Sequence, residues 1–179
     1  MAIDDLTSFI PPPSSPIQTS GDWSVAEQDL GVVFPSDFKD LIQTYGTGEF
    51  FGNLGIENPL REWGRDGIRD RLERYRELRE ACEWSFPLFP ESPGLLPWGS
   101  DDNGHLYCWW TEGQPDDWSI VQLFHGYEED PLEIVPGPIT QFLIDFVSNK
   151  YPNMLGGNER SSEHHKFRVG ILGRNHGDD

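Results

Sequence analysis

Basic residues are scarce in this sequence. The 179 residues include 31 Asp and Glu but only 13 Lys and Arg, which gives a formal net charge of −18. Between residues 81 and 149 there is no Lys or Arg, while twelve acids fall in the same stretch. A chain of this charge repels phosphate backbones and anionic lipid surfaces. Direct binding to nucleic acid or membrane is therefore disfavoured, and basic partners are attracted instead.

Cysteine and long apolar runs are also scarce. Cys82 and Cys108 are the only two cysteines, and their spacing fits neither a zinc site nor a disulfide framework. Two reduced thiols are expected, as in a reducing compartment. The first five residues carry acids where a signal peptide needs basic residues, and no stretch approaches the ~20 apolar residues of a membrane span. These features predict a cytoplasmic protein without metal or cofactor.

The composition along the chain predicts one folded domain between two tails. Residues 1–20 contain a Pro- and Ser-rich run with little to bury, which favours a tail. Residues 156–179 are polar, rich in Gly and His, and weakly periodic, so they are interpreted as a second tail. The domain between them spans residues 21–155, and its abundant aromatic residues supply much of the core.

Helical periodicity marks four segments. Ser24 and Glu27 have the spacing of a capping box and predict a short helix that ends before Gly31. A second helix is predicted from Pro35 to Gly46, a charged amphipathic one over 61–80, and a last one after Pro138. Within the third, oppositely charged residues recur four positions apart, which is typical of a solvated face.

Residues 94–135 have the pattern of an antiparallel β-meander. Short aromatic runs alternate with turn signals, of which Asn103-Gly104 is the strongest hairpin signal. The predicted fold class is α+β, with helices packed on one side of the meander. The core is expected to contain the following apolar and aromatic residues: Phe38, Leu41, Ile42, Trp98, Leu106, Ile120, Phe142 and Phe146.

The order of several short motifs resembles the SUKH superfamily, whose namesake is the yeast Smi/Knr regulator of cell-wall synthesis. The motifs are Leu30-Gly31, Phe34-Pro35-Ser36-Asp37-Phe38-Lys39, Tyr45-Gly46-Thr47-Gly48, Gly94-Leu95-Leu96-Pro97-Trp98-Gly99, Asn103-Gly104, Leu106-Tyr107-Cys108-Trp109 and Pro115-Asp116-Asp117-Trp118. No single motif is decisive, but their joint order is much more specific. The resemblance covers roughly residues 21–150 and implies an α+β fold. The long charged helix over 61–80 and both tails depart from a minimal domain of this kind.

The resemblance also implies a function. Bacterial members of the superfamily act as immunity proteins, or antitoxins, that bind and neutralise a cognate polymorphic toxin, often a nuclease. A basic toxin domain is therefore the expected partner. The residues expected to meet it are acids of the meander and its loops: Asp101, Asp102, Asp116, Asp117, Glu128, Glu129, Asp130 and Glu133. Exposed charges of this kind steer association and set specificity.

Two other functions stay open. A regulatory or scaffold protein with a non-toxin partner is the alternative within the family. An enzyme acting on a carbohydrate or nucleotide would need two carboxylates close together in space, which a sequence cannot exclude. No catalytic residue is assigned, because only His105 and His125 accompany the acids of the region without Lys or Arg.

Other candidate sites have simpler explanations. The acids of 101–104 are adjacent, whereas a calcium loop alternates its oxygen ligands, so a hairpin turn is favoured. Cys108 lies in an aromatic strand, where a buried, inert thiol is usual. The histidines of the C-terminal segment lack the helical spacing and Cys partners of a metal site. Trp109 and Trp110 must face opposite sides of a strand, so at most one of them joins a ligand-stacking surface.

Overall fold

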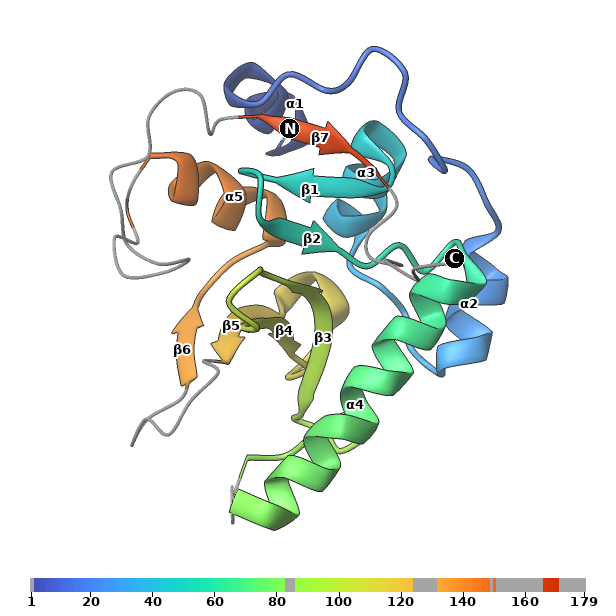
Figure 1. Ribbon diagram of the computed structural model, residues 1–179, viewed down its shortest axis with the longest axis vertical. Helices are drawn as coiled ribbons and strands as arrows, with labels where there is room; N and C mark the ends of the chain where they lie inside the picture. Colours follow the sequence, from blue (N-terminus) through green and yellow to red (C-terminus); the bar gives the residue numbers. More distant parts are fainter. Residues whose placement is uncertain (1, 83–85, 124–131, 149, 151–165, 171–179) are drawn as a thin grey trace, which may run out of the picture.

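The computed structural model describes residues 2–82, 86–123, 132–148, 150 and 166–170. Five α-helices, a short 3₁₀ helix and seven strands alternate along these residues (Figure 1). In chain order they are α1 (Ala2–Phe9), α2 (Trp23–Leu30), α3 (Ser36–Tyr45), β1 (Gly48–Phe50), β2 (Leu54–Ile56), α4 (Glu62–Cys82), β3 (Leu95–Ser100), β4 (Leu106–Trp110), η1 (Pro115–Asp117), β5 (Ser119–Leu123), β6 (Leu132–Val135), α5 (Ile139–Val147) and β7 (Phe167–Val169).

All seven strands form one antiparallel sheet in the order β6-β5-β4-β3-β2-β1-β7. Strands β3 to β6 follow one another in sequence and in space, as short connections between strands require. The predicted α+β class with an antiparallel meander is therefore confirmed. The predicted hairpin lies between β3 and β4, where Gly104 has the positive φ of 84° that glycine adopts readily.

The two faces of the meander bury different side chains, because successive residues of a strand point to opposite sides. On the first face, Tyr107, Trp109 and Ile120 pack with α3 and α5 in the main hydrophobic core. On the second face, Leu106, Cys108 and their neighbours from β5 form a smaller cluster. All eight residues predicted for the core are buried, each with at most 4% of its surface exposed.

The position of α4 differs from the expectation that the helices pack on one side. Strand β2 pairs with β3 only near Gly99 and Ser100, so the rest of β3 has no strand on that side. Helix α4 runs along it instead (Figure 1). Its Ile68 and Leu72 join the main core, whereas Tyr75 packs into the cluster on the second face. This long helix, together with the bridge between Leu88 and Leu95, thus covers that edge of the sheet.

The segment predicted as an N-terminal tail is in fact part of the fold. Helix α1 packs on α5 and α3, and its Leu6, together with Ile10, is fully buried. The chain after it is held by backbone contacts: the Tyr45 hydroxyl donates to the Ile10 carbonyl over 2.5 Å, and the Thr47 N–H donates to the Ile17 carbonyl over 3.0 Å. The tail interpretation was wrong because apolar residues 3, 6 and 10 form one helical stripe.

The predicted C-terminal tail also contributes a strand. Residues Phe167–Val169 form β7, which pairs with β1 at the edge of the sheet. Phe167 packs against Tyr45 and Phe50, with ring centroids 5.2 and 4.7 Å away. One aromatic side chain therefore anchors a segment whose overall composition is polar. Apart from residues 166–170, the predicted tail lies outside the described residues.

The start of α2 also differs from the prediction. Asp22 is the N-cap, and its carboxylate accepts a hydrogen bond from the Ser24 N–H over 2.9 Å. The predicted partner Glu27 turns away instead, accepts from the Phe34 N–H over 3.0 Å and pairs with Lys39 over 2.6 Å. Gly31 follows the helix in the left-handed conformation, as predicted.

Candidate functional site

Asp101, the first of the predicted partner-binding acids, is buried. Its Oδ1 accepts from the backbone N–H groups of Asn103 and His105 over 2.9 and 3.0 Å. Its Oδ2 lies 2.9 Å from Nδ1 of His105 and accepts from the Tyr107 hydroxyl over 3.3 Å. With no side-chain surface exposed, Asp101 holds the hairpin together and is not placed to meet a partner.

Asp116 is exposed but engaged at a helix end. Its Oδ1 accepts from the Ser36 N–H over 2.6 Å, at the first residue of α3. Pro35, the N-cap of α3, offers no side-chain hydrogen bond of its own, so a residue 80 positions away supplies the cap. Asp37 does the same for α5, because its carboxylate accepts from the N–H and hydroxyl of Thr140.

The remaining predicted acids do not form one continuous face. Asp102 is exposed before β4 begins and Asp117 is exposed after β4 ends, so the length of that strand separates them. Glu133 lies in β6 opposite Gln122, and its side chain is outside the described residues. Glu128, Glu129 and Asp130 are also outside the described residues. The structure brings none of the described acids together into a single cluster.

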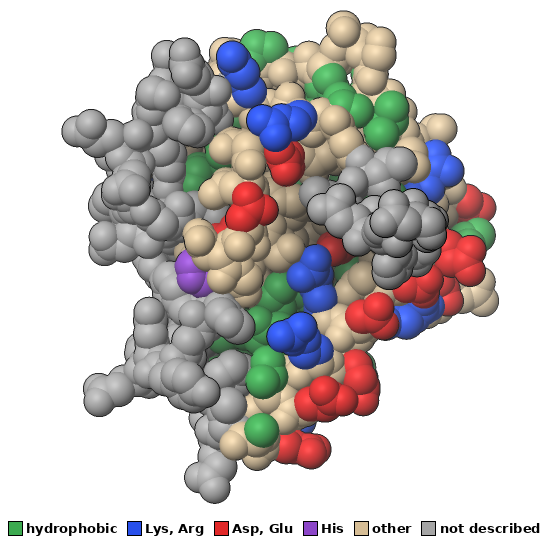
Figure 2. Space-filling model, in the orientation of Figure 1, with side chains coloured by type: hydrophobic (Ala, Val, Ile, Leu, Met, Phe, Trp, Pro, Cys, Tyr) green, Lys and Arg blue, Asp and Glu red, His purple; other side chains and the backbone are tan. Residues whose placement is uncertain are grey.

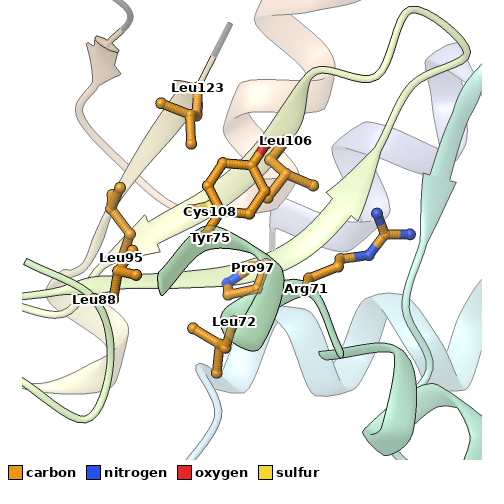
Figure 3. A pocket seen from close by; sticks show the side chains of 9 residues that line it. All are labelled: Arg71, Leu72, Tyr75, Leu88, Leu95, Pro97, Leu106, Cys108 and Leu123. Atoms are coloured by element: carbon orange, nitrogen blue, oxygen red, sulfur yellow. The ribbon is translucent and has the colours of Figure 1, made fainter. Parts of the chain in front are cut away.

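The thiol of Cys108 lies at a small apolar cavity on the second face of the sheet. The cavity has a volume of about 10 Å³, and Tyr75 and Leu72 of α4 line it (Figure 3). Burial raises the pKa of the Cys108 thiol and raises that of Tyr75 to about 12. Such a thiol stays protonated and unreactive near neutral pH.

The tryptophans of the meander belong mainly to the core. Trp98 and Trp109 are fully buried against each other and against helix α3 or α5. Trp118 is 7% exposed, and Trp110 is partly buried against the cluster on the second face. In this part of the chain, these rings do not form an open stacking surface.

Neither metal binding nor membrane insertion has support among the described residues. No group of three or more His, Cys, Asp or Glu side chains there is arranged to hold a metal ion. Across the described helices, none combines the length and the apolar character that crossing a membrane requires.

Two neighbouring hollows lie along α4. The first, of about 500 Å³, lies between α2 and α4 and is lined by Val25, Gln28 and charged residues of α4. The second, of about 480 Å³, lies between the end of α2, α4 and the loop before β3. Its floor is apolar: Leu30, Ile68, Leu72, Phe89, Pro90 and Leu96.

An ion-pair network separates the two hollows. Asp29 of α2 accepts from Arg65 and Arg69 of α4, both over 2.6 Å, and Arg69 and Asp29 line both depressions. Hydrogen bonds from Arg69 and then Arg65 hold the pKa of Asp29 below its ordinary value. Figure 2 shows acidic and basic side chains interspersed over the part of the surface where α4 lies.

The two hollows and the ion pairs between them are called the α4 groove from here on. The sequence did not single out this groove. The sequence predicts ion pairs between residues four positions apart within α4. In the structure the charged residues of α4 pair instead with residues of other elements or with residues three positions away on the helix, such as Arg69 with Asp66 over 2.9 Å. A usable signal was present, because Arg65 and Arg69 follow one another at helical spacing and thus share a face. Their partner on α2, however, depends on how the two helices pack.

Comparison with known families identifies the chain. The sequence model of the SUKH family described as SMI1-KNR4 cell-wall matches residues 20–143. The match runs from just before α2 to the first half of α5, so α1 and β7 lie outside it. No match is found among curated proteins. Because the match covers more than half of the sequence and the fold is an α+β domain with the antiparallel meander, this chain belongs to the SUKH family.

Proposed function

We propose that this protein is an immunity protein, which binds a cognate polymorphic toxin in the cytoplasm and neutralises it. Family membership carries the proposal, since the matched residues span four of the five helices and the whole meander. The favoured class of toxin is a nuclease domain. The protein acts by binding rather than by catalysis.

The charge of the chain supports a basic partner. Nucleases meet phosphate backbones through Lys and Arg, so their functional surfaces are positively charged. A chain with a net charge of −18 is attracted to such surfaces over long distances and competes with the nucleic acid for them. Masking the surface would then block the toxin without any chemical step.

A regulatory or scaffold protein is the second candidate within the same family. The two candidates differ in what the partner does when the protein is absent: a toxin harms the cell, whereas a regulated protein does not. A neighbouring gene for a large secreted protein with a C-terminal toxin domain would favour the first candidate.

The first experiment is purification of the tagged protein from the cell that naturally makes it, followed by identification of what co-purifies. We expect a stoichiometric complex with a basic domain from a toxin. Purified complex should lack the nuclease activity that the isolated domain shows. Recovery of the protein without a partner from toxin-producing cells, or of a complex that keeps full toxin activity, would overturn the proposal.

A further inference from the structure

The groove along α4 is lined in part by exposed apolar side chains, although Ile68, Leu72 and Leu96 of its floor are at most 7% exposed. Val25 of α2 lines the first hollow with 52% of its surface exposed, and Leu30 and Phe89 line the second while only partly buried. Exposed apolar surface framed by charged residues is typical of interaction sites. The groove therefore offers burial to apolar side chains of another molecule.

The arginines of the groove are already engaged within the protein. Arg65 binds Asp29 and the Pro59 carbonyl, over 2.6 and 2.9 Å. Arg69 binds Asp29 and Asp66. Arg76 binds Glu73 and the Phe89 carbonyl, over 3.0 and 3.1 Å. These cations are held by neighbouring acids and carbonyls, so an anionic ligand would have to break existing ion pairs.

Two carboxylates of the groove differ from these arginines in their exposure and in their partners. Glu62 lines the first hollow and Asp70 lines the second, and both are exposed. Neither has an ion pair or side-chain hydrogen bond among the residues that the structure describes. They stand eight residues apart on α4, or about 12 Å at the helical rise of 1.5 Å per residue. The unmatched charge of the groove is therefore negative and lies at two separate points.

We propose that this groove binds a basic amphipathic helix of a partner protein. Apolar side chains of the helix lie on the floor between α2, α4 and Phe89, and two Lys or Arg residues about two turns apart meet Glu62 and Asp70. This is the helix-in-groove mode of recognition. The inference rests on the proposed function in naming a basic protein partner, and it assigns the contact to α4 rather than to the meander.

The test uses two synthetic 15-residue peptides of equal Leu and Lys content. In one peptide the leucines form a single helical stripe, and in the other their order is scrambled. Binding to the full chain is measured by NMR, which gives both the affinity and the residues whose amides shift. The groove variant is Glu62→Gln with Asp70→Asn. The matched control is Asp102→Asn with Asp117→Asn, which removes the same charge from exposed positions elsewhere.

We expect the striped peptide to bind more tightly than the scrambled one and to shift amides within residues 25–31, 62–76 and 89–90. The groove variant should lose about fivefold more affinity than the control, as expected for two exposed ion pairs. Equal losses in the two variants, shifts confined to other regions, or no preference for the striped peptide would overturn the inference.

Failure here is distinguishable from failure of the proposed function. If the chain neutralises a co-purified toxin with full affinity in the groove variant, the immunity function stands and the groove assignment falls. If no toxin is neutralised but the striped peptide binds the groove, the groove assignment stands and the partner is of another class.

Discussion

Individual carboxylates in this protein hold backbone segments together through hydrogen bonds. Asp101 gathers two backbone N–H groups, a histidine ring and a tyrosine hydroxyl at the β3–β4 hairpin. Asp116 and Asp37 cap α3 and α5 from outside those helices' own N-cap positions. An acid that accepts from backbone donors in this way satisfies groups that would otherwise lose their hydrogen bonds.

The role of Asp101 leads to a stability prediction. Asp101→Ala removes the acceptor of a buried hydroxyl and of two partly buried N–H groups, so the free energy of unfolding should fall by about 2 kcal/mol. Its neighbour Asp102 is exposed and provides the control, since Asp102→Ala should change stability by no more than about 0.5 kcal/mol. Urea unfolding of both variants measures the difference. Equal stability of the two variants would contradict the assigned role.

A pH prediction follows from Asp37. Burial raises its pKa above the ordinary 3.8, although hydrogen bonds from Thr140 act in the opposite direction. Because the folded state holds the proton more tightly, the stabilising contribution is complete below the unfolded pKa and is lost as pH rises through the folded pKa.

We therefore expect the stability of the wild type relative to Asp37→Asn to fall as pH rises from about 3.5 towards neutrality. The measurement is the free energy of unfolding of both proteins in urea across this pH series. A relative stability that increases with pH would mean that the hydrogen bonds to Thr140 outweigh burial.

Sequence reasoning could not foresee these roles. In the sequence, the acids around residues 101 and 116 cannot be told apart from acids of exposed loops. Only the geometry of the turn determines which of them points inward. By contrast, Phe142 and Trp98 were predictable as core residues because large aromatic side chains in periodic segments gain most from burial.

At the scale of elements, the meander and the helices α2, α3 and α5 were predictable because periodicity and turn residues agree. Helix α1 and strand β7 were missed. Each is short and lies in a polar, Gly- or Pro-rich surrounding, so average composition conceals the few apolar residues that dock them. Both elements also lie outside the family match, and β7 pairs with β1 at the edge of the sheet.

The docking of α1 is testable with two substitutions. Leu6 is fully buried, whereas Phe9 is 48% exposed on the same helix. Leu6→Ala should lower the free energy of unfolding by about 2–5 kcal/mol, the usual range for a buried leucine. Phe9→Ala should cost less, because about half of the Phe9 surface stays in contact with water in the folded protein. Thermal or urea unfolding in which both variants match the wild type would restore the interpretation of residues 1–20 as a tail.

At the scale of the whole molecule, long-range electrostatic attraction and direct contact with a partner depend on different residues. In the proposed complex, the acids between residues 101 and 133 contribute to a field that would attract a basic partner from a distance. The α4 groove would instead supply apolar surface and two carboxylates at contact. Distant charges mainly change the association rate, whereas contact residues mainly change the dissociation rate.

This separation gives a kinetic prediction for the co-purified partner. Replacing Glu128, Glu129 and Asp130 by Gln, Gln and Asn should slow association and flatten its salt dependence, with little effect on dissociation. Replacing Glu62 and Asp70 by Gln and Asn should instead speed dissociation. Surface plasmon resonance across a salt series measures both rates. If the first variant keeps the wild-type association rate and salt slope, the loop acids have no steering role.

The proposed function is that this SUKH-family protein neutralises a toxin by binding it. The most direct measurement is the viability of a naive host that expresses the co-purified partner alone, together with this chain, or together with the destabilised Leu6→Ala variant. The account predicts that the partner alone kills, that the intact chain restores growth, and that the variant rescues less in proportion to its loss of folded protein. A partner that is harmless by itself, or that kills equally well beside the intact chain, would contradict the account.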